Sequence, residues 1–109
     1  IPMIDARREE VYTMILDHNK KVIKNTWAEV LNVDSFLKYS NDKDCVFFGS
    51  GSMKFKSINP KGKNIFLVEE CFPSSKDMIM KGYDLFNKKK FESVAYYEPF
   101  YLKEFVSSN

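Results

Sequence analysis

The residues from Glu10 to Leu16 constrain the fold of this chain more than any other segment. They form a β-branched and aromatic run that ends at the turn formers Asp17-His18-Asn19, a pattern typical of a β-strand. Both alternating faces of the run are largely apolar, with Val11, Thr13 and Ile15 on one face and Tyr12, Met14 and Leu16 on the other. We therefore expect a strand in the interior of a sheet that is covered on both sides.

Two further strands flank this run in the sequence. Ile1–Ile4 precedes it, and the turn Asp5-Ala6-Arg7-Arg8-Glu9 between them predicts an antiparallel pair. Lys21–Leu31 follows and is more polar. Its lysines predict an edge strand, because charged side chains on an edge discourage pairing with other molecules.

After residue 31 the pattern changes to strands that alternate with helices. Asp34 is placed to cap a short helix over Ser35–Tyr39. The apolar run Cys45–Phe48 predicts a buried parallel strand that turns sharply into a helix or loop, and Asn64–Val68 predicts a fifth strand. The whole order is typical of an α/β, ribonuclease H-like domain, with a mixed five-stranded sheet, three antiparallel strands and then parallel ones, and helices packed on it.

The clearest helix signal covers Ser74–Lys90. Ser74 can cap its N-terminus, and Lys88-Lys89-Lys90 complements the negative end of its dipole. The spacing of Ile79, Gly82, Tyr83 and Phe86 predicts a buried stripe, with Gly82 allowing close approach to the sheet. The aromatic tail Phe91–Asn109 either packs on the chain's own core or is offered to a partner.

Length and composition predict one globular domain over residues 1–109, with 44% hydrophobic and 29% charged residues. The net charge of +2 is far below that of dedicated nucleic-acid binders. No apolar run approaches the length of a membrane span, no leader is recognisable, and the two cysteines favour a reduced, cytoplasmic protein. The opening on Ile1 without a Met indicates a fragment or a processed chain.

Motifs for catalysis are weak in this sequence. Its single histidine, His18, is best interpreted as a solvated turn residue, and neither cysteine has a recognisable base nearby, so we expect no catalytic residue, no metal site and no cofactor. Asp5, Glu9 and Glu10 resemble a carboxylate cluster, but the adjacent arginines are expected to neutralise them. Gly49-Ser50-Gly51 after a buried strand is a weak candidate for a phosphate contact.

Three segments resemble motifs of TsaB-type proteins, also called YeaZ-type. Ile4–Tyr12 resembles the IDAR-x-x-EVY hairpin that opens the C-terminal half of this family, Phe48–Gly51 resembles its VG-x-G strand exit, and Glu98–Lys103 resembles its EP-x-YLR ending. They occur in the family's order, with two departures: Lys103 replaces a usual Arg, and Glu9 replaces a frequent Gly. The residues that match the motifs are Asp5, Ala6, Arg7, Glu10, Val11, Tyr12, Gly49, Gly51, Glu98, Pro99, Tyr101 and Leu102.

This resemblance implies a function that the residues alone do not. TsaB-type proteins are non-catalytic partners in the formation of N6-threonylcarbamoyladenosine at adenosine 37 of tRNA, and they have paired ribonuclease H-like domains of the actin and Hsp70 superfamily. The resemblance therefore implies a C-terminal half whose N-terminal half is absent. It also implies a TsaD-type catalytic partner, a TsaE-type ATPase, indirect contact with tRNA and a homodimer of the full-length protein, with no membrane partner. The protease activity suggested by the wider family's older label, glycoprotease, is not supported by these residues.

Two alternatives stay open at this point. The first is a nucleotide-binding ribonuclease H-like domain that uses Gly49, Ser50 and Gly51. The second is an unrelated protein-interaction module with the same kind of sheet.

Overall fold

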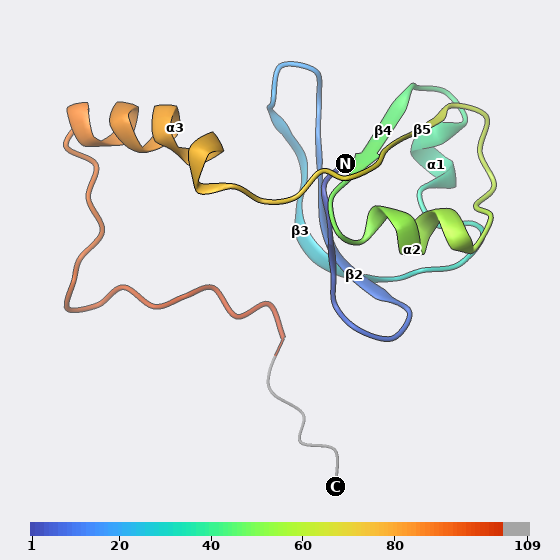
Figure 1. Cartoon of the computed structure of the whole chain (residues 1–109), viewed down its shortest axis with the longest axis horizontal. Helices are drawn as coiled ribbons and strands as arrows, with labels where there is room; N and C mark the ends of the chain where they lie inside the picture. The colour runs from blue at the N-terminus through green and yellow to red at the C-terminus, as the bar shows by residue number, and fades with distance from the viewer. Residues whose placement is uncertain (104–109) are drawn as a thin grey trace, which may run out of the picture. The chain divides into compact units, whose positions relative to one another are not determined.

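The computed structural model describes residues 1–103 and divides the chain into two compact units (Figure 1). The first unit is Ile1–Phe72, and the second begins at Pro73, where one domain was expected over residues 1–109. The first unit holds the strands β1 (Met3–Asp5), β2 (Glu10–Leu16), β3 (Val22–Val30), β4 (Cys45–Phe48) and β5 (Ile65–Val68), with the helices α1 (Leu37–Ser40) and α2 (Ser52–Ser57). The second unit holds the helix α3 (Ser75–Asn87).

The first three strands form an antiparallel sheet in the order β1-β2-β3. The central place of β2 and the edge place of β3 are as predicted, and β3 pairs with β2 through two register irregularities. One face of β2 is buried, at Val11, Thr13 and Ile15, whereas the alternating residues are only half-buried. The second face is therefore less covered than the apolar pattern predicts.

The last two strands form a separate parallel sheet in which Cys45 lies beside Ile65 and Phe48 beside Val68. The continuous five-stranded sheet expected from the sequence is not present among the described residues. An isolated parallel bridge between Pro2 and Phe48 is the strand contact that joins the two sheets. Hydrogen bonds reinforce it, because the Ile1 nitrogen donates to the Val46 carbonyl at 2.8 Å and the Phe48 N–H to the Ile1 carbonyl at 3.3 Å.

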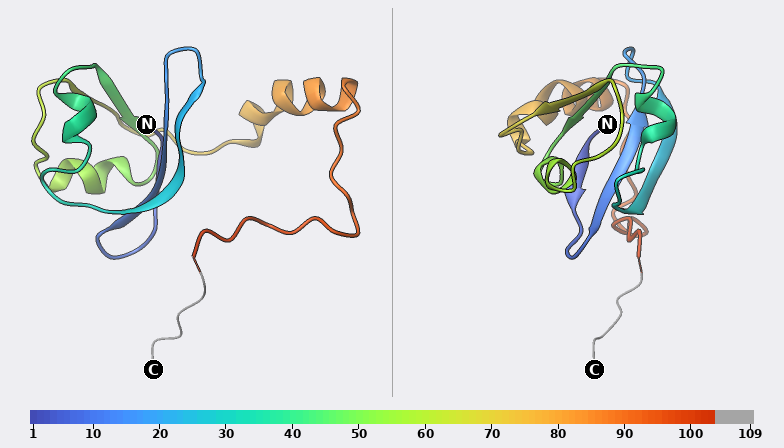
Figure 2. Two further views of the ribbon diagram at one scale, coloured as in Figure 1. Left: turned by 180° about the vertical axis from the view of Figure 1, so that it is seen from behind. Right: turned by 90° about the vertical axis from the view of Figure 1, so that its right-hand side faces the viewer.

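An aromatic cluster forms the centre of the core in the first unit. Phe47 and Phe55 are fully buried, and their ring centroids lie 4.6 Å apart. Phe36 meets both rings edge to face at 5.3 and 5.4 Å. The helix α2, which carries Phe55, contacts both β1 and β5 and so lies against both sheets (Figures 1 and 2).

The helix α1 begins later than the sequence suggests. Its N-cap is Phe36, in a left-handed conformation with φ of 63° and no side-chain cap, so the predicted cap at Asp34 is wrong. The Asp34 carboxylate instead pairs with the Lys61 ammonium at 2.9 Å. The local pattern predicted that the Asp34 side chain would cap the helix, but this side chain forms a long-range ion pair instead.

The helix α3 begins and is capped as predicted, but its burial is not. Ser74 has an extended backbone, and its hydroxyl accepts the Lys76 N–H at 3.2 Å. No residue of α3 is buried, so the predicted buried stripe is wrong, and a Cβ built on Gly82 would meet nothing within 4 Å. In the described part of the tail, Tyr96, Tyr97 and Phe100 are also exposed, and residues 104–109 lie outside the described range.

Candidate functional site

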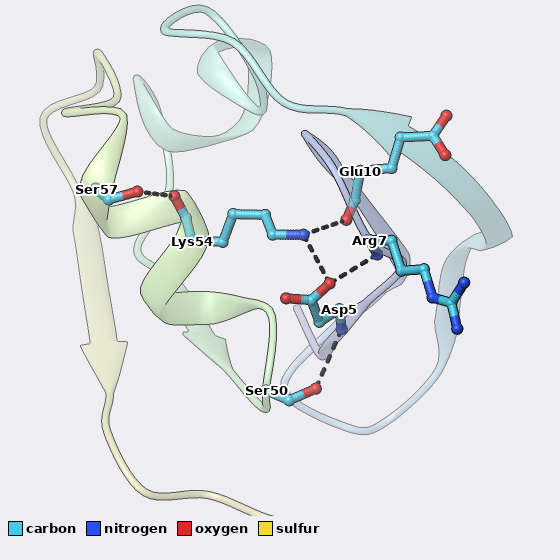
Figure 3. Close-up of polar contacts among 6 residues, drawn as sticks. All are labelled: Asp5, Arg7, Glu10, Ser50, Lys54 and Ser57. Atoms are coloured by element: carbon cyan, nitrogen blue, oxygen red, sulfur yellow. Dashed lines mark hydrogen bonds and ion pairs between the residues drawn. The ribbon is translucent and has the colours of Figure 1, made fainter.

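Two of the three motif segments meet in the first unit, although the contacting residues Asp5 and Ser50 are 45 positions apart in the sequence (Figure 3). The Asp5 N–H, at the end of β1, donates to the Ser50 hydroxyl at 3.1 Å. The Gly51 N–H donates to the Met3 carbonyl at 3.1 Å. These bonds join the hairpin turn between β1 and β2 to the loop that leaves β4, and we call this contact the hairpin–exit junction.

Lys54 on α2 stabilises the hairpin–exit junction. Its ammonium donates to the Asp5 carboxylate at 2.7 Å and to the Glu10 carbonyl at 3.1 Å. The same Asp5 oxygen accepts the Arg7 N–H at 2.7 Å, which closes the turn. The Lys54 side chain is only 18% exposed. Among the ion pairs found within residues 1–103, this one is therefore the best shielded from water.

Asp5 is held as a carboxylate by these donors. The hydrogen bond from Lys54, followed by the hydrogen bond from the Arg7 backbone, lowers the pKa of Asp5 from its ordinary value of 3.8. The prediction that adjacent arginine side chains neutralise the acids of the turn is wrong for Asp5, because its cation is Lys54, and Figure 3 shows the Arg7 guanidinium pointing away from Asp5. Sequence reasoning missed Lys54 because it lies 49 positions from its partner.

The two glycines of the strand exit are required by close packing. Gly49 has a φ of +100°, and a Cβ built there would lie 2.3 Å from the Met3 carbonyl oxygen. A Cβ on Gly51 would lie 2.7 Å from a methyl carbon of Val11. Both distances are far below van der Waals contact, so only glycine lets this loop approach β1 and β2 so closely.

The same loop offers little to a phosphate. The Gly51 N–H is bonded to the Met3 carbonyl, and the Ser52 N–H and hydroxyl are both bonded to the Gly49 carbonyl. The Ser50 hydroxyl already accepts the Asp5 N–H, and the ionised Asp5 lies beside it. The Gly51 N–H and both Ser52 donors therefore serve the fold, and the nearby carboxylate would repel an anion.

The remaining motif residues lie in both units and differ in burial. The Ala6 N–H closes the hairpin by donating to the Glu10 carbonyl at 3.1 Å, Val11 is fully buried, and Tyr12 is half-buried on β2. In the second unit Glu98, Pro99 and Tyr101 are exposed, and Leu102 is half-buried.

A pocket of about 680 Å³ lies elsewhere in the first unit and was not anticipated from the sequence. It is lined by residues from β2, from β4 and from the segments beside them, among them Ile15, His18, Tyr39 and Cys45. Burial raises the pKa of the Cys45 thiol, which disfavours its thiolate form. Its charged lining residues are mixed in sign, with Asp17, Asp44, Lys20 and Lys43, and they select no class of ligand.

Residues 1–103 contain no group of three side chains arranged to hold a metal ion. Within the same range, none of the helices has the length and apolar character needed to cross a membrane. A scan of protein-family models and searches of curated proteins and of solved structures found no match to this chain.

Proposed function

We propose that this chain is part of a non-catalytic accessory subunit for the formation of N6-threonylcarbamoyladenosine in tRNA, acting beside a TsaD-type catalytic subunit. The proposal rests on the resemblance of Ile4–Tyr12, Phe48–Gly51 and Glu98–Lys103 to TsaB-type motifs. The observation that supports it most is the hairpin–exit junction, where the first two of these segments contact each other through named bonds. Two short matches that contact each other in the structure are more informative together than they would be separately.

We also infer that the two sheets correspond to the single sheet of a ribonuclease H-like domain. The bridge between Pro2 and Phe48 sets the β1 side of the antiparallel sheet beside the β4 side of the parallel sheet. The implied order is β3-β2-β1-β4-β5, which matches the strand pattern expected from the sequence. In this interpretation, the chain is the C-terminal half of a two-domain protein.

The proposed role as a scaffold agrees with how the motif residues are used. Asp5 is occupied by Lys54 and by the turn, and Gly49 and Gly51 serve close packing. Each of these residues contributes to the local structure, and none of the three presents a free reactive group. We propose that the catalytic partner supplies the chemistry, and that tRNA and the TsaE-type ATPase are contacted through that complex.

Co-purification tests this proposal. The complete gene that encodes this chain is expressed with an affinity tag together with the TsaD-type protein of the same organism. We expect a complex at micromolar concentration that survives gel filtration. Failure to form a complex, with both proteins folded by circular dichroism, would contradict the proposal.

A matched pair of variants connects this test to the motif. Gly49→Val disrupts the hairpin–exit junction and should reduce recovery of the complex, whereas Gly82→Ala, at an open position on α3, should not. Equal recovery of the complex with folded Gly49→Val and with wild-type protein would show that partner binding does not depend on the hairpin–exit junction.

A further inference from the structure

The outer edge of β5 is a strand edge without the protection seen on β3. The edge strand β3 carries Lys24 and two register irregularities, which are features that prevent pairing with other molecules. In contrast, β5 consists of Ile65, Phe66, Leu67 and Val68, with no charge, no proline and no bulge. Among the described residues, β4 is its one strand neighbour.

Alternate residues of β5 direct their backbone groups away from β4. The Cys45 N–H donates to the Asn64 carbonyl at 2.9 Å, so Asn64 faces β4. Because backbone direction alternates along a strand, Phe66 and Val68 also face β4, and Ile65 and Leu67 face outward. The outward N–H and C=O groups are spaced to form a hydrogen-bonded pair with an antiparallel strand.

We propose that β5 pairs with the same strand of a second copy of this chain, antiparallel and about a twofold axis at Phe66. A twofold axis perpendicular to a sheet pairs residues on the same face. Ile65 of one copy then lies opposite Leu67 of the other, and both are outward-facing residues. Phe66 lies opposite Phe66 of the second copy, on the face where this side chain is 53% exposed.

The charges at the ends of β5 favour this register. Asn64 lies opposite Val68 in this register, and the positions just beyond them, outside β5, are Lys63 of one copy and Glu69 of the other, a contact that the symmetry forms twice. Both side chains are exposed. Glu69 accepts Lys56 through one carboxylate oxygen at 2.6 Å, and a carboxylate has a second oxygen that can accept a hydrogen bond from Lys63. A parallel register would lose this complementarity, because it sets Lys63 beside Lys63.

The exposed apolar face beside β5 extends the contact. Val46 and Val68 are each 45% exposed and lie on the same face as Phe66. In the proposed pair these side chains line one continuous apolar strip across the two copies. The strand is short, so we expect a weak dimer with a Kd of roughly 100 μM. This proposal does not depend on the function proposed above.

Sedimentation equilibrium of the 109-residue chain between 10 μM and 1 mM tests the proposal. We expect the average mass to rise from 12.8 kDa toward twice that value with concentration. Lys63→Glu and Glu69→Lys should each raise the Kd about tenfold, because each creates two like-charge contacts, and the double variant should restore association. Phe66→Lys should abolish it by placing two ammonium groups at the axis.

The controls separate this surface from others. Lys21→Glu makes the same charge change immediately before the edge strand β3 and should leave the Kd unchanged. Circular dichroism verifies that each variant is folded. The proposal is overturned by a chain that stays at 12.8 kDa up to 1 mM, or by a dimer that folded Lys63→Glu and Phe66→Lys leave intact. Loss of the dimer in Phe86→Ser alone would assign association to α3 and would equally overturn it.

Discussion

Gly49 has no room for a side chain, and this makes it the most sensitive single position of the hairpin–exit junction. We expect Gly49→Ala to lower the free energy of unfolding by roughly 2 to 4 kcal/mol, because the new Cβ meets the Met3 carbonyl and the backbone has a φ of +100°. Urea denaturation followed by tryptophan fluorescence measures the change. Gly82→Ala is the matched control and should not lower stability. Equal losses in the two variants would show that the close approach is not as described.

Asp5 gives the same junction a pH dependence. Its pKa in the folded chain lies below the ordinary 3.8, mainly because of Lys54, so protonation favours the unfolded chain. The stabilisation is therefore fully present above pH 3.8 and is lost as the pH falls through the lowered pKa. Thermal unfolding should show a lower Tm for Asp5→Asn at pH 6, with the gap to wild type closing below pH 3.8. A gap for Asp5→Asn that persists at pH 2 would contradict the assignment.

At the scale of elements, the cap of α3 is the local feature most open to test. Ser74→Ala removes the hydroxyl that accepts the Lys76 N–H and should destabilise the first turn by about 1 kcal/mol. Backbone Cα chemical shifts over residues 75–79 report the loss of helix. Ser75→Ala changes the neighbouring serine inside the helix and should be close to neutral. Similar shift changes in both variants would be inconsistent with a cap at Ser74.

The elements also show what the sequence could and could not predict. The strands β2, β4 and β5 and the cap at Ser74 follow from residues that are neighbours in the chain, so their positions were close to the expected ones. The partner of Asp5 could not be predicted, because Lys54 lies on α2, a helix that the sequence left undecided between helix and loop. The predicted burial of α3 was wrong for a related reason. An apolar stripe indicates that one face of a helix can be buried, but it does not specify which other surface would cover that face.

At the scale of the whole molecule, the first unit combines two sheets that meet at one bridge and share the helix α2. Its hairpin–exit junction is built from two of the segments that resemble TsaB-type motifs. This connection between a structural contact and a family resemblance is the basis of the proposed scaffold function. Co-purification tests partner binding, and an experiment on the complete gene in its own cells tests the effect on tRNA.

Nucleoside mass spectrometry of tRNA is the most direct test. It would compare wild-type cells, cells depleted of the protein that contains this chain, and depleted cells that carry the complete gene on a plasmid. The account predicts that N6-threonylcarbamoyladenosine falls on depletion and returns with the plasmid. An unchanged level of this nucleoside in depleted cells would contradict it.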